Sequence, residues 1–101
     1  MVVYDAILFM MMLAEARLVV VEQVHPDLGV VTIEFTYEYR EEPYYEYVML
    51  NLLPDNLQAG DVLRRGDNGV IVDHAKTRQR RERLLEMYRQ LPRAPGGDIT
   101  L

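Results

Sequence analysis

Five cations within eight residues are the side chains of this sequence whose spacing most clearly suggests binding chemistry. Residues 76–83 contain a single acid, Glu82, beside the cations Lys76, Arg78, Arg80, Arg81 and Arg83. Ammonium and guanidinium groups at this density can bind phosphate, or they can simply form a solvated helix face. A third possibility joins them to residues 34–46, which hold five glutamates and one arginine. We favour this contact between opposite charges, within one molecule or between two, and it predicts weaker stability or assembly in added salt.

Aromatic residues accompany those glutamates along a predicted hairpin. Aromatic rings on a sheet can stack on nucleic-acid bases, or they can pair across strands and cover a core or a protein interface. Because carboxylates surround the rings and repel phosphates, the sequence favours the core or a protein contact. The candidate protein-contact residues, with one from the N-terminal segment, are Phe9, Phe35, Tyr37, Tyr39, Tyr45 and Tyr47.

Catalytic chemistry finds little support in this composition. The chain has no cysteine and no serine, which excludes thiol and serine nucleophiles. It contains no phosphate loop, no dinucleotide fingerprint and no zinc-protease motif. The paired carboxylates of Glu41 and Glu42 lie in a predicted exposed loop, which does not favour general acid–base catalysis. We therefore expect no enzyme activity, no catalytic residues and no cofactor.

The two histidines, His25 and His74, form too small a set for a metal site in a chain without cysteine. Asp27 or Asp73 would complete such a site only if the fold brought these residues together. We interpret the histidines as turn and helix-cap residues and expect no bound metal.

Length and charge place these side chains in one domain, residues 1–101. The net charge of −5 opposes nucleic acid and anionic lipid except at the cation cluster. The apolar run from Met1 to Leu13 is shorter than the roughly 20 residues of a membrane span, and no basic residue precedes it as in a signal peptide. The absence of cysteine fits a reducing compartment, so we expect a cytoplasmic protein.

The N-terminal segment allows three interpretations. Asp5 can cap a helix over residues 6–15, which is rich in Ala, Leu and Met. A strand is the competing structure. A third possibility is that translation starts within Met10–Met12, which would make residues 1–9 an extension of the gene model. A helix that is apolar all round has to be buried or paired with another chain.

Period-two patterns and turn residues predict five short strands. Residues 31, 33, 35, 37 and 39 alternate with polar positions, as in a half-buried antiparallel strand. The turns fall at 25–29, 40–43 and 66–69, and the strands at 17–24, 30–39, 44–50, 61–65 and 70–72. A helix follows from Asp73 or Thr77 to Leu91, with Pro92 stopping it before a tail.

A structural turn links the hairpin to the fourth strand. Pro54 cannot donate to a sheet, Gly60 suits a positive φ, and Asp61 can bond nearby backbone amides. Small barrels turn their corners in this way. We therefore expect a mainly β fold capped by a C-terminal α-helix: a five-stranded antiparallel barrel of SH3-like or OB-like type, closed or partly closed, or a strongly bent sheet. Its parts are an apolar N-terminal segment (1–15), the barrel (16–73), the helix (74–91) and the tail (92–101).

Residues 17–91 resemble a small bacterial family of unknown function, the domain-of-unknown-function family numbered three thousand and six. The resemblance lies in the apolar first strand, in Leu53-Pro54, in the run Gly60 to Leu63, and in the residues after it. Those later matching positions are 70–73, Thr77, Arg81, Leu84 and Leu91. It implies a compact β-unit followed by an arginine-rich helix, and an accessory role, but no activity. The tyrosine-rich hairpin is longer than the family's usual one.

The sequence thus favours a non-catalytic interaction module that assembles with itself or joins a larger protein complex. The contact surface would be the tyrosine-rich hairpin, the apolar N-terminal segment or both. The alternative is a nucleic-acid-binding accessory protein that uses the arginine-rich helix. An exposed basic helix would favour the alternative, and a basic helix neutralised by the hairpin would favour assembly.

Overall fold

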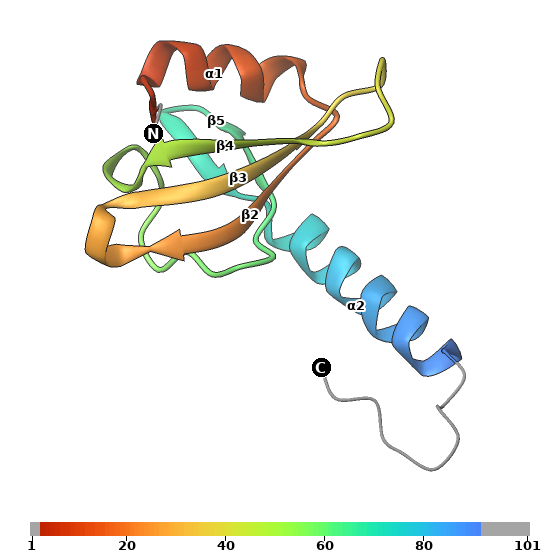
Figure 1. Ribbon diagram of the computed structural model, residues 1–101. Coiled ribbons are helices and arrows are strands. Elements are labelled where there is room, and N and C mark those ends of the chain that lie inside the picture. Colours follow the sequence, from red (N-terminus) through yellow and green to blue (C-terminus); the bar gives the residue numbers. More distant parts are fainter. Residues whose placement is uncertain (1–2, 92–101) are drawn as a thin grey trace.

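The computed structural model describes residues 3–91 (Figure 1). It is a small mixed α/β protein with a C-terminal helix and two sheets, in which five strands pair antiparallel and one short strand pairs in parallel. The elements in chain order are β1 (Val3–Tyr4), α1 (Ala6–Glu15), β2 (Leu18–His25), η1 (Pro26–Leu28), β3 (Val30–Thr36), β4 (Tyr44–Met49), η2 (Leu50–Leu52), β5 (Leu63–Gly66), β6 (Gly69–Val72) and α2 (His74–Gln90). The predicted strands and helices are all present, with shifted ends.

The main sheet has the strand order β1-β4-β3-β2. Strands β2, β3 and β4 form an antiparallel meander, and the two-residue β1 pairs in parallel with β4. The alternation predicted along β3 is confirmed, because Val31, Ile33, Phe35 and Tyr37 are all buried. Strand β1 was not predicted, since two residues carry no period-two signal.

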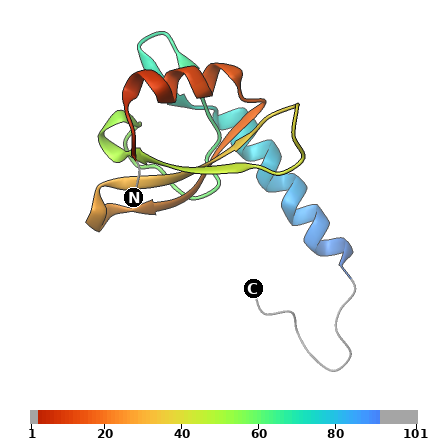
Figure 2. The same cartoon turned by 45° about the horizontal axis from the view of Figure 1, so that its top comes forward.

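Helix α1 covers the inner face of this sheet (Figure 2). It begins where the Asp5 side chain accepts the Leu8 amide at 2.9 Å, so the helical alternative for residues 6–15 is confirmed. Phe9 meets Phe35 edge to face, with ring centroids 6.0 Å apart. The core consists of Phe9, Leu13, Val19, Val21, Val31, Ile33, Phe35, Tyr37, Val48, Leu53 and Leu63. Residues before Met10 therefore take part in the fold.

Strands β5 and β6 form a separate hairpin, and this corrects the expectation of a closed barrel. Only one isolated bridge, Val20 to Val62, links the main sheet to the start of this hairpin within the described residues. The physical reason is that α1 packs against β5 and covers the core. The core is therefore buried without further pairing between the strands.

The predicted turn between β4 and β5 is confirmed. Gly60 has φ +95°, and the Asp61 carboxylate accepts the Gln58 amide at 2.9 Å. The turn is held against β2, because the Gly60 amide donates to the Val21 carbonyl at 2.8 Å and the Val21 amide donates to the Asp61 carbonyl at 2.8 Å. Pro54, which has no amide to donate, lies just after η2.

Strand β3 ends at Thr36, three residues earlier than predicted. The Arg40 amide donates to the Tyr37 carbonyl at 3.5 Å, which starts a turn inside the predicted strand. Tyr37 stays buried beside Tyr44, with ring centroids 5.7 Å apart. Tyr39 leaves the inner face at this turn and is 75% exposed.

Helix α2 projects from the domain (Figures 1 and 2). Its cap is Asp73, whose carboxylate accepts the Lys76 amide at 3.0 Å, so the earlier of the two predicted starts is correct. The predicted stop at Pro92 and the predicted tail lie outside the described residues. No helix among residues 3–91 is long and apolar enough to cross a membrane.

Candidate cationic pocket and contact surfaces

The structure divides the aromatic candidates into a buried and an exposed set. Phe9, Phe35 and Tyr37 are 1%, 0% and 5% exposed. These three rings have no surface to offer a partner, so their expected role as contact residues is corrected to a role in the core. The reason is that the inner sheet face and α1 bury aromatic rings against each other. Tyr39, Tyr45 and Tyr47 remain exposed.

Tyr45 and Tyr47 lie on the outer face of the main sheet. Glu34 is the β3 residue paired with Tyr45, and Thr32 is paired with Tyr47. The pKa of the Tyr45 phenol is raised, mainly by a hydrogen bond to the Glu34 carboxylate and secondly by the negative charge of that carboxylate. The outer face therefore combines exposed rings with carboxylate charge, which suits a cationic or apolar protein surface better than a phosphate.

All five predicted patch cations lie on α2 between Lys76 and Arg83. Within the described part of the chain, the ion pairs are Arg40 with Glu42, Arg64 with Asp73, and Arg89 with Glu86. None of them joins the patch to the glutamates of residues 34–46. The charge contact favoured from the sequence is therefore not formed within one molecule across residues 3–91.

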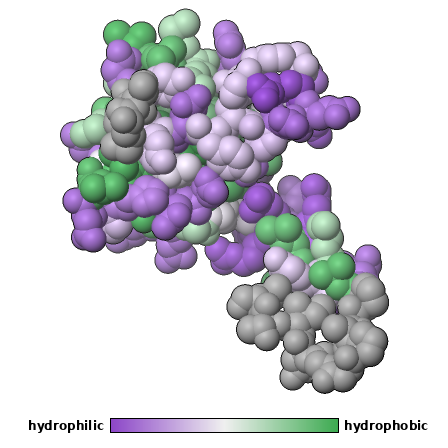
Figure 3. All heavy atoms as spheres, in the orientation of Figure 1, coloured by the Kyte–Doolittle hydropathy of each residue, from purple (hydrophilic) through white to green (hydrophobic). Residues whose placement is uncertain are grey.

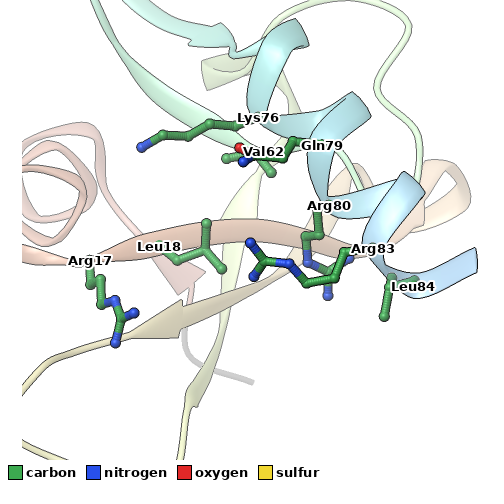
Figure 4. A pocket seen from close by; sticks show the side chains of 8 residues that line it. All are labelled: Arg17, Leu18, Val62, Lys76, Gln79, Arg80, Arg83 and Leu84. Carbon is green, nitrogen blue, oxygen red and sulfur yellow. The ribbon is translucent and has the colours of Figure 1, made fainter. Parts of the chain in front are cut away.

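Three of the patch cations line a pocket of about 310 Å³ between the beginning of β2 and the first half of α2 (Figure 4). A fourth cation, Arg17, comes from the residue just before β2. The apolar part of the lining is Leu18, Val62 and Leu84. Figure 4 shows the Arg83 side chain reaching from α2 toward Leu18. The eight lining residues are Arg17, Leu18, Val62, Lys76, Gln79, Arg80, Arg83 and Leu84, and none of them is an acid.

Backbone and side-chain hydrogen bonds fix the two walls of this pocket. The Arg17 amide donates to the Thr36 carbonyl at 2.8 Å. The buried Thr77 hydroxyl accepts the Val62 amide at 2.9 Å and donates to the Asp73 carbonyl at 2.8 Å. The Asp73 amide in turn donates to the Val62 carbonyl at 2.8 Å. The first turn of α2 is thus held against Val62, the residue just before β5.

Beyond this anchor, the C-terminal half of α2 carries an uncovered group of apolar side chains, which we call the apolar band. Thr77 is the only buried residue of α2. Figure 3 shows hydrophobic side chains along the projecting part of the helix. The apolar band, 36–57% exposed, consists of Leu84, Leu85, Met87, Tyr88 and Leu91. The sequence predicts a helix that caps the barrel, whereas this half of α2 leaves its apolar side chains exposed.

Neither histidine lines the cationic pocket, and the His25 ring lies beside Tyr47 on the outer face, with ring centroids 6.4 Å apart. The His25 ring nitrogen Nε2 is 2.8 Å from the Thr32 hydroxyl, and His74 is the first residue of α2. Among the residues that the structure describes, no cluster of His, Asp or Glu is arranged to hold a metal ion.

Comparison with known proteins finds no matching family model, no matching curated protein and no matching solved structure. The resemblance to the bacterial family of unknown function therefore stays a prediction.

Proposed function

We propose that this protein is a non-catalytic assembly module that associates with a second copy of itself through α2. The observation that carries the proposal is the apolar band, which nothing in residues 3–91 covers. Burying a Leu or Met side chain fully stabilises a contact by about 1.5–3 kcal/mol. Short isolated helices are marginal in water, so a partner that covers the band also stabilises α2.

Charge argues against two α2 helices pairing with each other. Residues 74–90 hold six cations and two glutamates, a net charge of +4, so two such helices side by side repel. The outer sheet face of a second copy is the better match. It offers Tyr45, Tyr47 and Met49 to the apolar band, and Glu34 to the arginines of the helix. If each copy placed its α2 on the outer sheet face of the other, related by a two-fold axis, the assembly would be a closed dimer.

Sedimentation velocity at low and high salt tests this proposal. The expected mass exceeds the 11.8 kDa of one chain and falls toward it as salt screens the charge contact. The double variant Leu84→Gln/Tyr88→Gln should be monomeric in both buffers. Gln79→Ala, on the same helix but outside the band, is the matched control and should keep the larger mass. Circular dichroism should show that every variant is folded.

An affinity pull-down from native extract, read by mass spectrometry, tests whether the partner is another protein and not a second copy of this chain. Accessory attachment to a larger complex would replace the self-association part of the proposal. A monomer at all salt concentrations that captures no protein would overturn the whole proposal.

One observation favours nucleic-acid binding as a second candidate. In the described residues, the glutamates of the hairpin form no ion pair with the exposed cations of α2. An exposed basic helix of this kind is what nucleic-acid binding requires. The net charge of −5 opposes it. Filter binding of single-stranded DNA and RNA at low salt is the test. Salt-sensitive binding that Arg78→Gln/Arg81→Gln abolishes would support this candidate.

A further inference from the structure

The cationic pocket between β2 and α2 gathers like charges that the fold does not neutralise. Four of its lining residues are cations, Arg17, Lys76, Arg80 and Arg83, and none is an acid. The ion pairs found among residues 3–91 use other arginines. Asp73, the cap of α2, accepts the Lys76 amide and pairs with Arg64. Among residues 3–91, no acid lines this pocket.

Such a cluster costs stability when it is empty. Like charges around one pocket repel each other, and Lys76, in the first turn of α2, opposes the helix dipole. The dipole and the four cations together favour an anion at this place. Thr77 and Val62 are both buried, and the Val62 amide donates to the Thr77 hydroxyl. This contact fixes the start of α2, the helix that carries three of the cations.

The floor of the pocket limits the kind of anion. Leu18, Val62 and Leu84 give it an apolar surface, and a volume of about 310 Å³ is at the small end of ligand sites in proteins. A compact molecule with one anionic group and a flat or apolar part would fit both features. The arginines favour phosphate, because their planar donor groups bind its oxygens in pairs.

The surroundings disfavour a long polyanion. Arg17 also borders a second hollow that contains Glu38 and Glu41. A nucleic-acid strand that leaves the cationic pocket on that side would bring its phosphates near these carboxylates, within the range of about 8 Å over which charges act at physiological salt. A single phosphate group avoids this repulsion.

We propose that the pocket lined by Arg17, Lys76, Arg80 and Arg83 binds a small phosphate-bearing molecule of about mononucleotide size. The pocket shares Leu84 with the apolar band, but none of its four cations belongs to the band, so this proposal does not depend on the proposed function. Helical spacing places Arg78 and Arg81 on another side of α2, and neither lines the pocket.

That spacing provides a matched pair of variants. Arg80→Gln/Arg83→Gln removes two charges from the pocket, and Arg78→Gln/Arg81→Gln removes two charges from the same helix outside it. The probes are inorganic phosphate and adenosine 5′-monophosphate, with adenosine as the uncharged comparison and a short single-stranded RNA as the polyanion. Calorimetric titration gives the affinity, and circular dichroism shows that each variant is folded.

The expected result is binding of adenosine monophosphate with Kd of about 1 mM or tighter, weakened at least about tenfold by Arg80→Gln/Arg83→Gln. The affinity should change less than about twofold in Arg78→Gln/Arg81→Gln, and adenosine should not bind. Binding of inorganic phosphate with the same variant dependence supports the anion site as well. Three results would overturn the proposal: no binding of either phosphate probe, equal losses in both double variants, or RNA as the only ligand. Sedimentation velocity of Arg80→Gln/Arg83→Gln shows whether this variant still self-associates. A loss of phosphate binding is thereby distinguished from a loss of assembly.

Discussion

At the scale of the residue, the face of the sheet decides what an aromatic side chain does. Phe9 and Phe35 pack edge to face in the core, whereas Tyr45 and Tyr47 face solvent on the outer side. All four side chains are aromatic, and Phe35, Tyr45 and Tyr47 lie on adjacent strands of one sheet. Their roles differ because one face is covered by α1 and the other is open.

This difference predicts two unlike outcomes for the same kind of substitution. Phe9→Ala should lower the free energy of unfolding by about 3–5 kcal/mol, because it removes a ring that is 1% exposed and leaves a cavity. Tyr39→Ala, at a residue that is 75% exposed, should change it by no more than about 0.5 kcal/mol. Urea denaturation of both variants measures these values. Similar losses in the two variants would show that the core assignment is wrong.

The buried phenol of Tyr37 predicts a loss of stability at high pH. Burial, and to a lesser extent the charges of Tyr39 and Glu15, raise the pKa of Tyr37 above its ordinary value. Folding therefore favours the neutral phenol. The stability it contributes is complete below about pH 10 and is lost as the pH rises through the raised pKa.

Urea denaturation from about pH 8 to about pH 11 measures this effect. Tyr37→Phe should flatten the fall in unfolding free energy above pH 10, because the substituted ring cannot ionise. Tyr47→Phe, at an exposed ring that does not contribute to the raised pKa of Tyr37, is the control and should leave the slope unchanged. An equally steep fall in the Tyr37 variant would contradict the prediction.

At the scale of the element, one threonine attaches α2 to the domain. The Thr77 hydroxyl accepts the Val62 amide at 2.9 Å and donates to the Asp73 carbonyl at 2.8 Å. The rest of the helix carries no buried side chain. The angle at which α2 leaves the domain therefore depends on this contact together with the Asp73 cap.

Thr77→Val keeps the side-chain volume and removes the hydroxyl. The buried Val62 amide then loses its acceptor, which should cost about 1–3 kcal/mol of unfolding free energy. Thr77→Ser keeps the hydroxyl and should cost less. Chemical denaturation of the two variants makes the comparison. A valine variant as stable as the serine variant would show that the hydrogen bond does not hold the helix.

At the scale of the whole molecule, a compact sheet-and-helix body carries one projecting helix (Figure 1). The core lies between the main sheet, α1 and the β5–β6 hairpin. Helix α2 begins at the border of this body and leaves it after its first turns. Local stability should follow this division, because buried contacts are what slow the opening of backbone hydrogen bonds.

Hydrogen exchange should therefore be slow in β2, β3 and β4 and fast in α2 after Thr77 when the protein is diluted to a monomer. In the assembled protein the same α2 amides should become protected, because a second copy covers the apolar band. The Leu84→Gln/Tyr88→Gln variant should show fast exchange in α2 at every concentration. Protection of α2 in the dilute monomer would mean that the helix needs no partner.

The amino-acid sequence determined the local features of this protein. Alternating residues gave β3, Asp5 and Asp73 gave the helix starts, and Gly60 gave the turn with its positive φ. These features depend on neighbours in the chain, so they can be recognised in a linear pattern. The cation cluster on α2 was visible for the same reason.

Only the tertiary structure decided which of these features meet. It left the barrel open because α1 takes the place of further strand pairing, and it ended β3 early in a tyrosine-lined turn. It placed Arg17 in one pocket with Lys76 and Arg83, which lie 59 and 66 residues further along the chain, an arrangement that no local pattern encodes. It also left the apolar stripe of α2 uncovered, because the direction of a helix depends on its packing rather than on its own periodicity.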